Sequence, residues 1–70
     1  MTELPVLKTK IHELRREHNM QQAELAALVG VRRETIGNLE NGKYNPSLKL
    51  AMDIAKVFEM PVEEIFFYVD

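Results

Sequence analysis

The sequence contains no cysteine and no long apolar run. Without cysteine there is no disulfide framework, and this absence favours a reducing, cytosolic compartment. The opening residues, MTELPVLKTK, lack the apolar stretch of a signal peptide or a transmembrane helix. We therefore expect a cytoplasmic protein that has no contact with a membrane.

The residues that catalysis or metal binding would need are also scarce. The two histidines, His12 and His18, do not form an HExxH zinc motif, which would need a histidine where Arg16 stands. Ser47 has no partner base and is better explained as a helix cap. Four glutamates that could pair as catalytic carboxylates fall on amphipathic segments instead, namely Glu13, Glu17, Glu63 and Glu64. The sequence predicts no metal, no cofactor and no enzymatic activity.

Length and charge permit one small domain that spans residues 1–70. The hydrophobic content of 46% is sufficient for a core. The net charge of −2 argues weakly against nucleic-acid binding, because such domains are usually basic. However, residues 1–49 carry eight Lys/Arg against six Asp/Glu, whereas residues 50–70 carry one against five. The first part of the chain can therefore still present a positive face to phosphate.

Apolar periodicity predicts five helices, at residues 7–18, 22–28, 32–40, 48–58 and 61–66. Asn19 and Gly30 suit left-handed turns, and Ser47 suits the N-cap of the fourth helix. The residues expected to face inward are Leu7, Ile11, Leu14, Leu25, Ala26, Leu28, Val29, Ile36, Leu39, Leu50, Ala51, Ile54, Ala55, Phe58, Val62, Ile65 and Phe66.

The tail Phe67-Tyr68-Val69 favours a strand, and it can pair with the extended segment Leu4-Pro5-Val6. We therefore expect an all-α, compact bundle of about five helices, to which a small terminal β pair can be added.

Residues 21–43 form the centre of this pattern, because they predict two short helices joined by a tight turn. Ala26, Gly30 and Ile36 stand where such a pair must be small, flexible and apolar. The outward face of the second helix carries hydrogen-bonding groups suited to the edges of DNA bases, namely Arg32, Arg33, Glu34, Thr35, Asn38 and Asn41.

The pattern QxxELAxxVGVxxxTIxxLENGK in this stretch resembles the lambda-repressor-like, xenobiotic-response-element family of helix-turn-helix proteins. The similarity extends from Ile11 to about Phe66 and is strongest to the short, single-domain members. It implies a transcriptional regulator, usually a repressor, in which helix 32–40 enters the major groove of double-stranded DNA. Two copies would bind a pseudo-palindromic operator as a homodimer, at the nucleoid and without a small-molecule ligand. The alternatives are the antitoxin of a toxin–antitoxin pair and a protein-interaction module that has kept the fold.

The resemblance also implies a role for each matching position. Arg33, Glu34 and Asn38 are the expected base contacts, and Arg15 with Glu40 is an expected structural ion pair. The expected phosphate contacts are Gln22, Arg32, Thr35, Asn41, Lys43 and Tyr44.

Three positions depart from the family pattern. Gln21 and Arg32 stand where the family usually has a capping Ser or Thr, and an uncapped N-terminus costs about 1 kcal/mol. We interpret Arg32 as retained for phosphate contact at the expense of stability, since a cation there opposes the helix dipole. Glu59 stands where the family usually has Gly, which leaves the geometry of that turn open.

Three of the five aromatic residues lie together near the end of the chain, and a small core can take only one or two of them. They can all pack on helix 48–58 and the N-terminal segment, or some of them can form a dimer interface. We favour the dimer interface, within a dimerisation tail at residues 62–70. Its expected contacts are Phe66, Phe67, Tyr68 and Val69.

Overall fold

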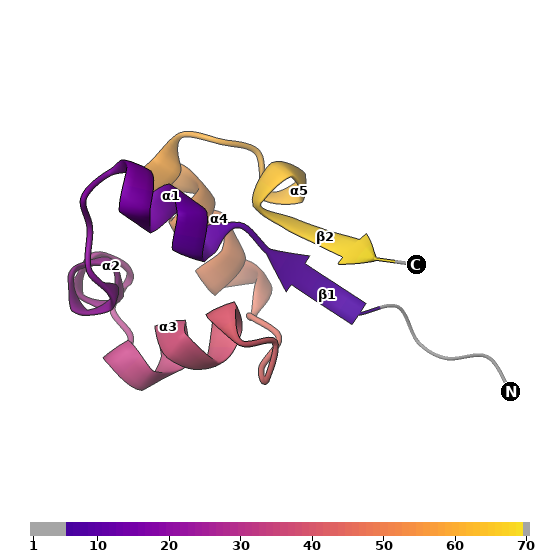
Figure 1. Cartoon of the computed structure of the whole chain (residues 1–70), viewed down its shortest axis with the longest axis horizontal. Helices are drawn as coiled ribbons and strands as arrows, with labels where there is room; N and C mark the ends of the chain where they lie inside the picture. The colour runs from indigo at the N-terminus through magenta and orange to yellow at the C-terminus, as the bar shows by residue number, and fades with distance from the viewer. Residues whose placement is uncertain (1–5, 70) are drawn as a thin grey trace, which may run out of the picture.

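The computed structural model describes residues 6–69, which form five helices and two strands around one core (Figure 1). In chain order the elements are β1 (Val6–Thr9), α1 (Ile11–Glu17), α2 (Gln22–Val29), α3 (Arg33–Glu40), α4 (Leu48–Phe58), α5 (Val62–Ile65) and β2 (Phe66–Val69). The expected helical bundle with a terminal strand pair is confirmed. None of the helices in residues 6–69 has the length and apolar character needed to span a bilayer.

The core is an apolar cluster to which every helix contributes. The predicted stripe of α4 is confirmed at all five of its positions, Leu50, Ala51, Ile54, Ala55 and Phe58. Ile11, Leu25, Ile36 and Ile65 complete the centre, because each is fully buried.

Leu28 was expected in this core and is instead 62% exposed. The inward face of α2 consists of Leu25 and Ala26, with Val29 partly buried. At 3.6 residues per turn, this face is centred about a quarter of a turn or more away from Leu28. The prediction that Leu28 faces inward rested on its hydrophobicity alone and was therefore wrong.

The predicted first helix is wrong at its start, because residues 6–9 form strand β1. β1 pairs antiparallel with β2, in the register Val6 with Val69 and Thr9 with Phe66. Two hydrogen bonds hold the exit from β1: the Lys10 N–H donates to the Ile65 carbonyl at 2.9 Å, and the Ile11 N–H donates to Thr9 Oγ1 at 3.0 Å. Helix α1 therefore begins at Ile11, after the strand has ended.

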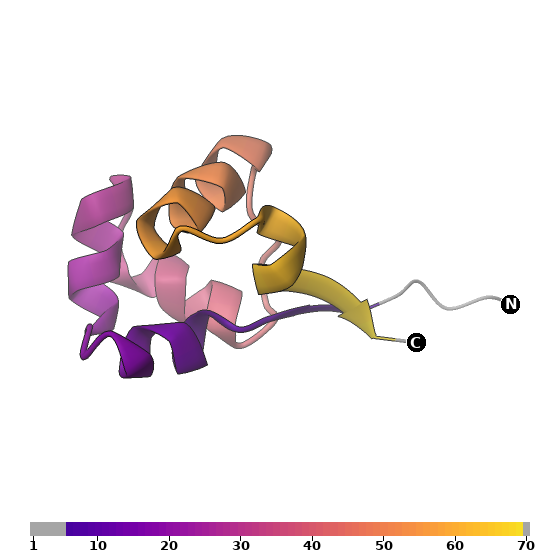
Figure 2. The same cartoon turned by 90° about the horizontal axis from the view of Figure 1, so that it is seen from above.

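The strand pair also revises the other end of the chain. Phe66 was expected as the last residue of the fifth helix, but its backbone is extended and it opens β2. Val6 was correctly expected to pair, whereas Leu4 and Pro5 lie outside the described residues. Figure 2 shows the resulting ribbon projecting from one end of the helical body.

Several predicted turns and caps are confirmed. Asn19 and Gly30 have φ of 52° and 73°, respectively, and Ser47 Oγ accepts a hydrogen bond from the Leu50 N–H at 3.1 Å. The expected weakness at Gln21 is only partly present, because the Glu24 carboxylate reaches back and accepts from the Gln21 N–H at 3.0 Å. Arg32 makes no side-chain cap on α3 in the described structure, as expected.

Glu59, at the position where the resemblance implies glycine, takes a left-handed backbone conformation with φ 55° and ψ 44°. A residue with a Cβ is strained there, so we expect Glu59→Gly to raise the free energy of unfolding by about 1 kcal/mol. Thermal or urea unfolding measures the change. The control is Glu59→Ala, which removes the same carboxylate but keeps the Cβ and should give no such gain. Equal effects of the two variants would refute backbone strain as the cause.

Candidate nucleic-acid interface

α2 and α3 form the helix-turn-helix, and Gly30 makes the turn between them. The Val31 N–H donates to the Ala26 carbonyl at 3.0 Å, which closes the end of α2 before the chain turns into α3. The two views show α2 steeply crossed with α3 (Figures 1 and 2), and in Figure 1 α3 runs along the lower edge of the molecule. Ile36 and Leu39 face inward and are buried, so the opposite face of α3 is directed to solvent.

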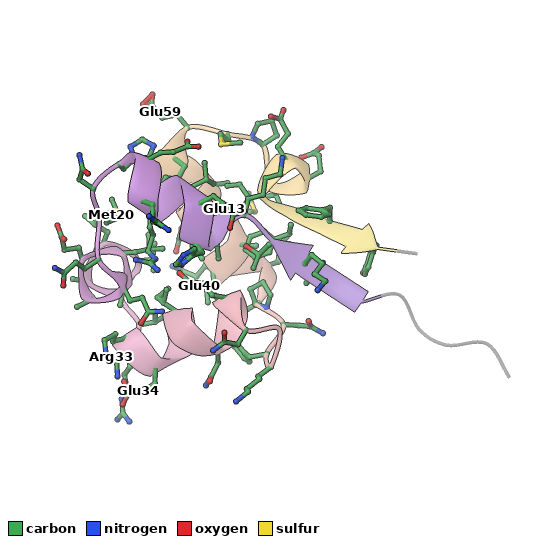
Figure 3. All side chains as sticks on the ribbon, in the orientation of Figure 1. Glu13, Met20, Arg33, Glu34, Glu40 and Glu59 are labelled. Atoms are coloured by element: carbon green, nitrogen blue, oxygen red, sulfur yellow. The ribbon has the colours of Figure 1, made fainter. Side chains whose placement is uncertain are left out.

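The three expected base contacts lie on this solvent-facing side of α3. Arg33, Glu34 and Asn38 are all exposed, and they come from the first two turns of the helix. In Figure 3 Arg33 and Glu34 lie at the start of α3, on the outer edge of the molecule. Guanidinium and amide groups on an exposed helix can form bidentate hydrogen bonds with guanine and adenine, respectively.

Most of the expected phosphate contacts lie at the ends of α3. Arg32 precedes its start and Asn41, Lys43 and Tyr44 follow its end, while Gln22, from α2, lies against the middle of α3 at Gly37. The Lys43 N–H donates to the Asn38 carbonyl at 2.9 Å, and this bond folds the following loop back against the helix. Arg32, Asn41, Lys43 and Tyr44 are exposed, whereas Gln22 and Thr35 are partly buried. The arrangement gives one line of polar groups, although contact with DNA stays a prediction.

Arg15 and Glu40, the expected ion pair, meet between α1 and the end of α3. Arg15 Nε donates to Glu40 Oε2 at 2.6 Å, and Arg15 Nη2 donates to Oε1 at 3.0 Å. Arg15 is only 7% exposed, and its Nη1 also donates to the Met20 carbonyl at 3.0 Å. This bidentate pair attaches α3 to α1 and to the loop that precedes α2.

Burial acts to raise the pKa of Glu40, but hydrogen bonds from Arg15 and Gln22, with the charges of Arg15 and His12, outweigh it. The pKa of this carboxyl therefore lies below its ordinary value of 4.5. At neutral pH Glu40 is ionised and accepts hydrogen bonds only.

This lowered pKa predicts a loss of stability in acid. Because the folded protein binds the Glu40 proton less tightly than the unfolded chain, its contribution is complete above pH 4.5 and is lost as the pH falls through the folded pKa. We expect Glu40→Gln to flatten this part of the curve of unfolding free energy against pH. Glu17→Gln, the same change at an exposed position, is the control. An unchanged curve for Glu40→Gln would contradict the prediction.

Gln22 makes two contacts that the sequence did not reveal. Its Nε2 donates to Glu40 Oε1 at 3.1 Å, and its Oε1 accepts from Arg33 Nη1 at 3.2 Å. The resemblance implied separate roles for these two residues, with Gln22 contacting phosphate and Arg33 contacting a base. The available signal was the spacing of Arg33, Gly37 and Glu40, which places all three on one side of α3.

The expected dimer contacts differ in how far they are buried. Phe66 is 8% exposed and belongs to the core, so it is not available as a dimer contact, whereas Tyr68 is 68% exposed. Phe67 is partly buried, and its ring lies 5.9 Å from Lys10 Nζ. Across residues 6–69, no three His, Asp or Glu side chains are grouped so that they could hold a metal ion.

The sequence profile described as Helix-turn-helix matches residues 11–65, which include α1 to α5. The chain belongs to the Cro/repressor-type helix-turn-helix family. In this helix-turn-helix protein the matched region contains every base and phosphate contact proposed above. Family membership makes it a DNA-binding transcriptional regulator rather than an enzyme.

Two archaeal relatives and one solved structure match this helix-turn-helix protein over most of their own length. An uncharacterized HTH-type transcriptional regulator of Archaeoglobus fulgidus is 60% identical over 62 residues, covering 89% of this chain and 87% of the relative. Another from Methanocaldococcus jannaschii is 50% identical over 64 residues, covering 91% and 97%. The crystal structure of a restriction-modification controller protein from Aeromonas hydrophila is similar with a TM-score of 0.72 and 31% identity, covering 79% and 83%.

Proposed function

We propose that this protein is a repressor that binds a pseudo-palindromic operator in double-stranded DNA as a homodimer. The observation that carries the proposal is the exposed face of α3, to which Arg33, Glu34 and Asn38 belong. Polar groups that can contact phosphate flank this face at both ends. Helices of such a kind read bases from the major groove, while phosphate contacts fix their register. Repression would follow from occlusion of the promoter.

The dimer is supported by an apolar surface outside the helix-turn-helix. Leu48, Met52 and Tyr68 are 74%, 56% and 68% exposed, respectively, and together we call them the apolar face. Leu48 and Tyr68 border a groove of about 880 Å³, which Ala51 and Val62 also line. Large exposed apolar side chains gathered in this way are typical of association surfaces.

A second copy of this chain is the occupant that we propose for the apolar face. A two-fold interface places the same surface of both subunits in contact, so that surface must be complementary to itself. Here projecting side chains and a hollow adjoin on one surface, and each protomer can therefore place its side chains in the groove of the other. The face is built from α4 and β2, which leaves α3 free for DNA.

A charge introduced into the apolar face should separate the protomers. We expect Leu48→Glu to lower the dimer affinity at least tenfold, because it places a charge in an apolar contact, while the fold stays intact because Leu48 is exposed. Light scattering after gel filtration measures the mass across a range of concentrations. Leu28→Glu, the same change at an exposed leucine of α2, is the matched control. If both variants remain dimeric, the apolar face is not the interface.

Selection of bound fragments from a random DNA library tests the function. The expected result is a two-fold symmetric site with half-sites about one helical turn apart, or 34–36 Å between the two copies of α3. A selected site without symmetry would contradict the homodimer. A library that shows no enrichment even at low salt would contradict DNA binding altogether.

A further inference from the structure

We propose that Glu40 is a positioning residue for base recognition, because it orients the Gln22 amide, which in turn holds Arg33. The inference rests on the proposed function, since it concerns how Arg33 reads DNA. It assigns Glu40 a second role beside its pairing with Arg15. Arg33 and Glu40 are the first and last residues of α3 (Figure 3), and Gln22, from the start of α2, contacts both of them.

Glu40 provides a fixed acceptor for one of these two contacts. Two hydrogen bonds from Arg15, at 2.6 and 3.0 Å, hold the carboxylate, and its side chain is 7% exposed. An ionised carboxylate can only accept hydrogen bonds. The group next to it must therefore present a donor.

Gln22 is that group, and its amide has a donor end and an acceptor end. Because Nε2 donates to Glu40 Oε1 at 3.1 Å, the carbonyl Oε1 is turned outward, where it accepts from Arg33 Nη1 at 3.2 Å. If the amide were reversed, its oxygen would face a carboxylate and its NH₂ group would face a guanidinium. Both contacts would then be repulsive. Glu40 thus fixes the polarity of Gln22, and Gln22 fixes the position of the guanidinium.

The Gln22 side chain lies against Gly37, between Arg33 and Glu40. A Cβ at this position would lie 3.7 and 3.8 Å from Gln22 Nε2 and Oε1, so the amide rests directly on the surface of α3. One hydrogen of Nε2 is used by Glu40, and the second stays available for a phosphate oxygen. Gln22 can therefore orient Arg33 and contact the DNA backbone at the same time.

The consequence is a guanidinium whose direction is set before DNA binds. When the guanidinium is already held, less conformational entropy is lost as the arginine side chain binds DNA. A fixed guanidinium plane also favours bidentate contact with guanine over contact with other bases. Glu40→Gln keeps the shape of the side chain but lets the Gln22 amide adopt either orientation. Discrimination at the base pair read by Arg33 should then fall.

The experiment compares Glu40→Gln with Arg15→Lys, at a temperature at which circular dichroism shows that both are folded. Arg15→Lys removes the bidentate geometry of the ion pair but leaves the Glu40 carboxylate as the acceptor for Gln22. The measured quantity is the ratio of affinities for the selected operator and for a version changed at the Arg33 base pair. We expect Glu40→Gln to reduce this ratio about 3- to 30-fold, and Arg15→Lys to leave it within about twofold.

A second pair of measurements makes the result specific. Gln22→Ala should reproduce the lost discrimination, and adding Glu40→Gln to it should reduce the ratio no further, because both act through one amide. If Glu40→Gln weakens binding to both operators by the same factor, Glu40 is a structural residue only and the proposal is overturned.

The free protein separates this inference from the proposed function. In the NMR spectrum the side-chain amide protons of Gln22 should be shifted and protected, and Glu40→Gln should return them to the values of an exposed glutamine. Protected protons together with a library that selects no DNA would uphold the contact and refute the function. Unprotected protons in the unmodified protein would overturn the positioning role, whatever DNA is selected.

Discussion

Replacing Arg15 with methionine is expected to lower the free energy of unfolding by about 3–5 kcal/mol. The variant leaves the Glu40 carboxylate, 7% exposed, without its two hydrogen bonds from the guanidinium. It also leaves the Met20 carbonyl without its donor. A domain of this size has little stability in reserve, so the variant should be largely unfolded at physiological temperature. Urea or thermal unfolding followed by circular dichroism gives the measurement.

The double variant Arg15→Met/Glu40→Leu separates the stranded charge from the lost packing. With both charges removed, an apolar pair of similar volume should restore most of the stability, because the desolvation of two ions is no longer required. We expect the free energy of unfolding of the double variant to lie within about 2 kcal/mol of that of the original protein. A single variant that costs less than about 1 kcal/mol would show that Glu40 is adequately solvated without Arg15.

Replacing Arg33 with alanine is expected to weaken binding to the selected operator by about 1–3 kcal/mol per half-site. A dimer contains two copies of the contact, so the total effect is roughly 30-fold to 10⁴-fold. The loss should be confined to operators that carry the preferred base pair, because Arg33 reads a base edge. Stability should change little, since Arg33 is exposed. Competition binding with operators altered one base pair at a time measures both effects.

Arg32→Ser provides the contrast at the neighbouring position. This change removes a cation expected on phosphate and supplies a good N-cap for α3, whose own cap residue makes no such bond in the described structure. The affinity should fall by a similar factor for every DNA sequence, and it should depend less on salt concentration. The free energy of unfolding should rise by about 1 kcal/mol. If the affinity changed no more than the stability did, the retention of Arg32 for phosphate would be refuted.

The features that the sequence predicted well are those that neighbouring residues determine. The apolar stripe of α4 repeats at helical spacing, and Ser47 stands directly before it as the N-cap. Asn19 and Gly30 mark turns through their own backbone preferences. The helix-turn-helix was recognisable for the same reason, because its fixed positions lie within one short stretch. The exposed face of α3 followed from that recognition.

The features that the sequence did not predict depend on partners far away in the chain. Leu7 has helical spacing with Ile11 and Leu14, and only β2, at the other end of the protein, shows that it belongs to a strand. The contacts of Gln22 with Arg33 and Glu40 depend on how α2 crosses α3. Such crossings are set by tertiary packing, and the spacing of Arg33, Gly37 and Glu40 shows only that these residues share one side of α3.

The pairing of β1 with β2 has a consequence for the order in which the protein folds. α1 to α4 make contacts close in sequence and can assemble rapidly, but the ribbon must join residues near opposite ends of the chain. The helices can therefore pack before the ribbon forms, and Tyr68 reaches its place in the apolar face only when the ribbon closes. In the homodimer proposed above, closure of the ribbon would thus complete the dimer surface on a helix-turn-helix that has already formed.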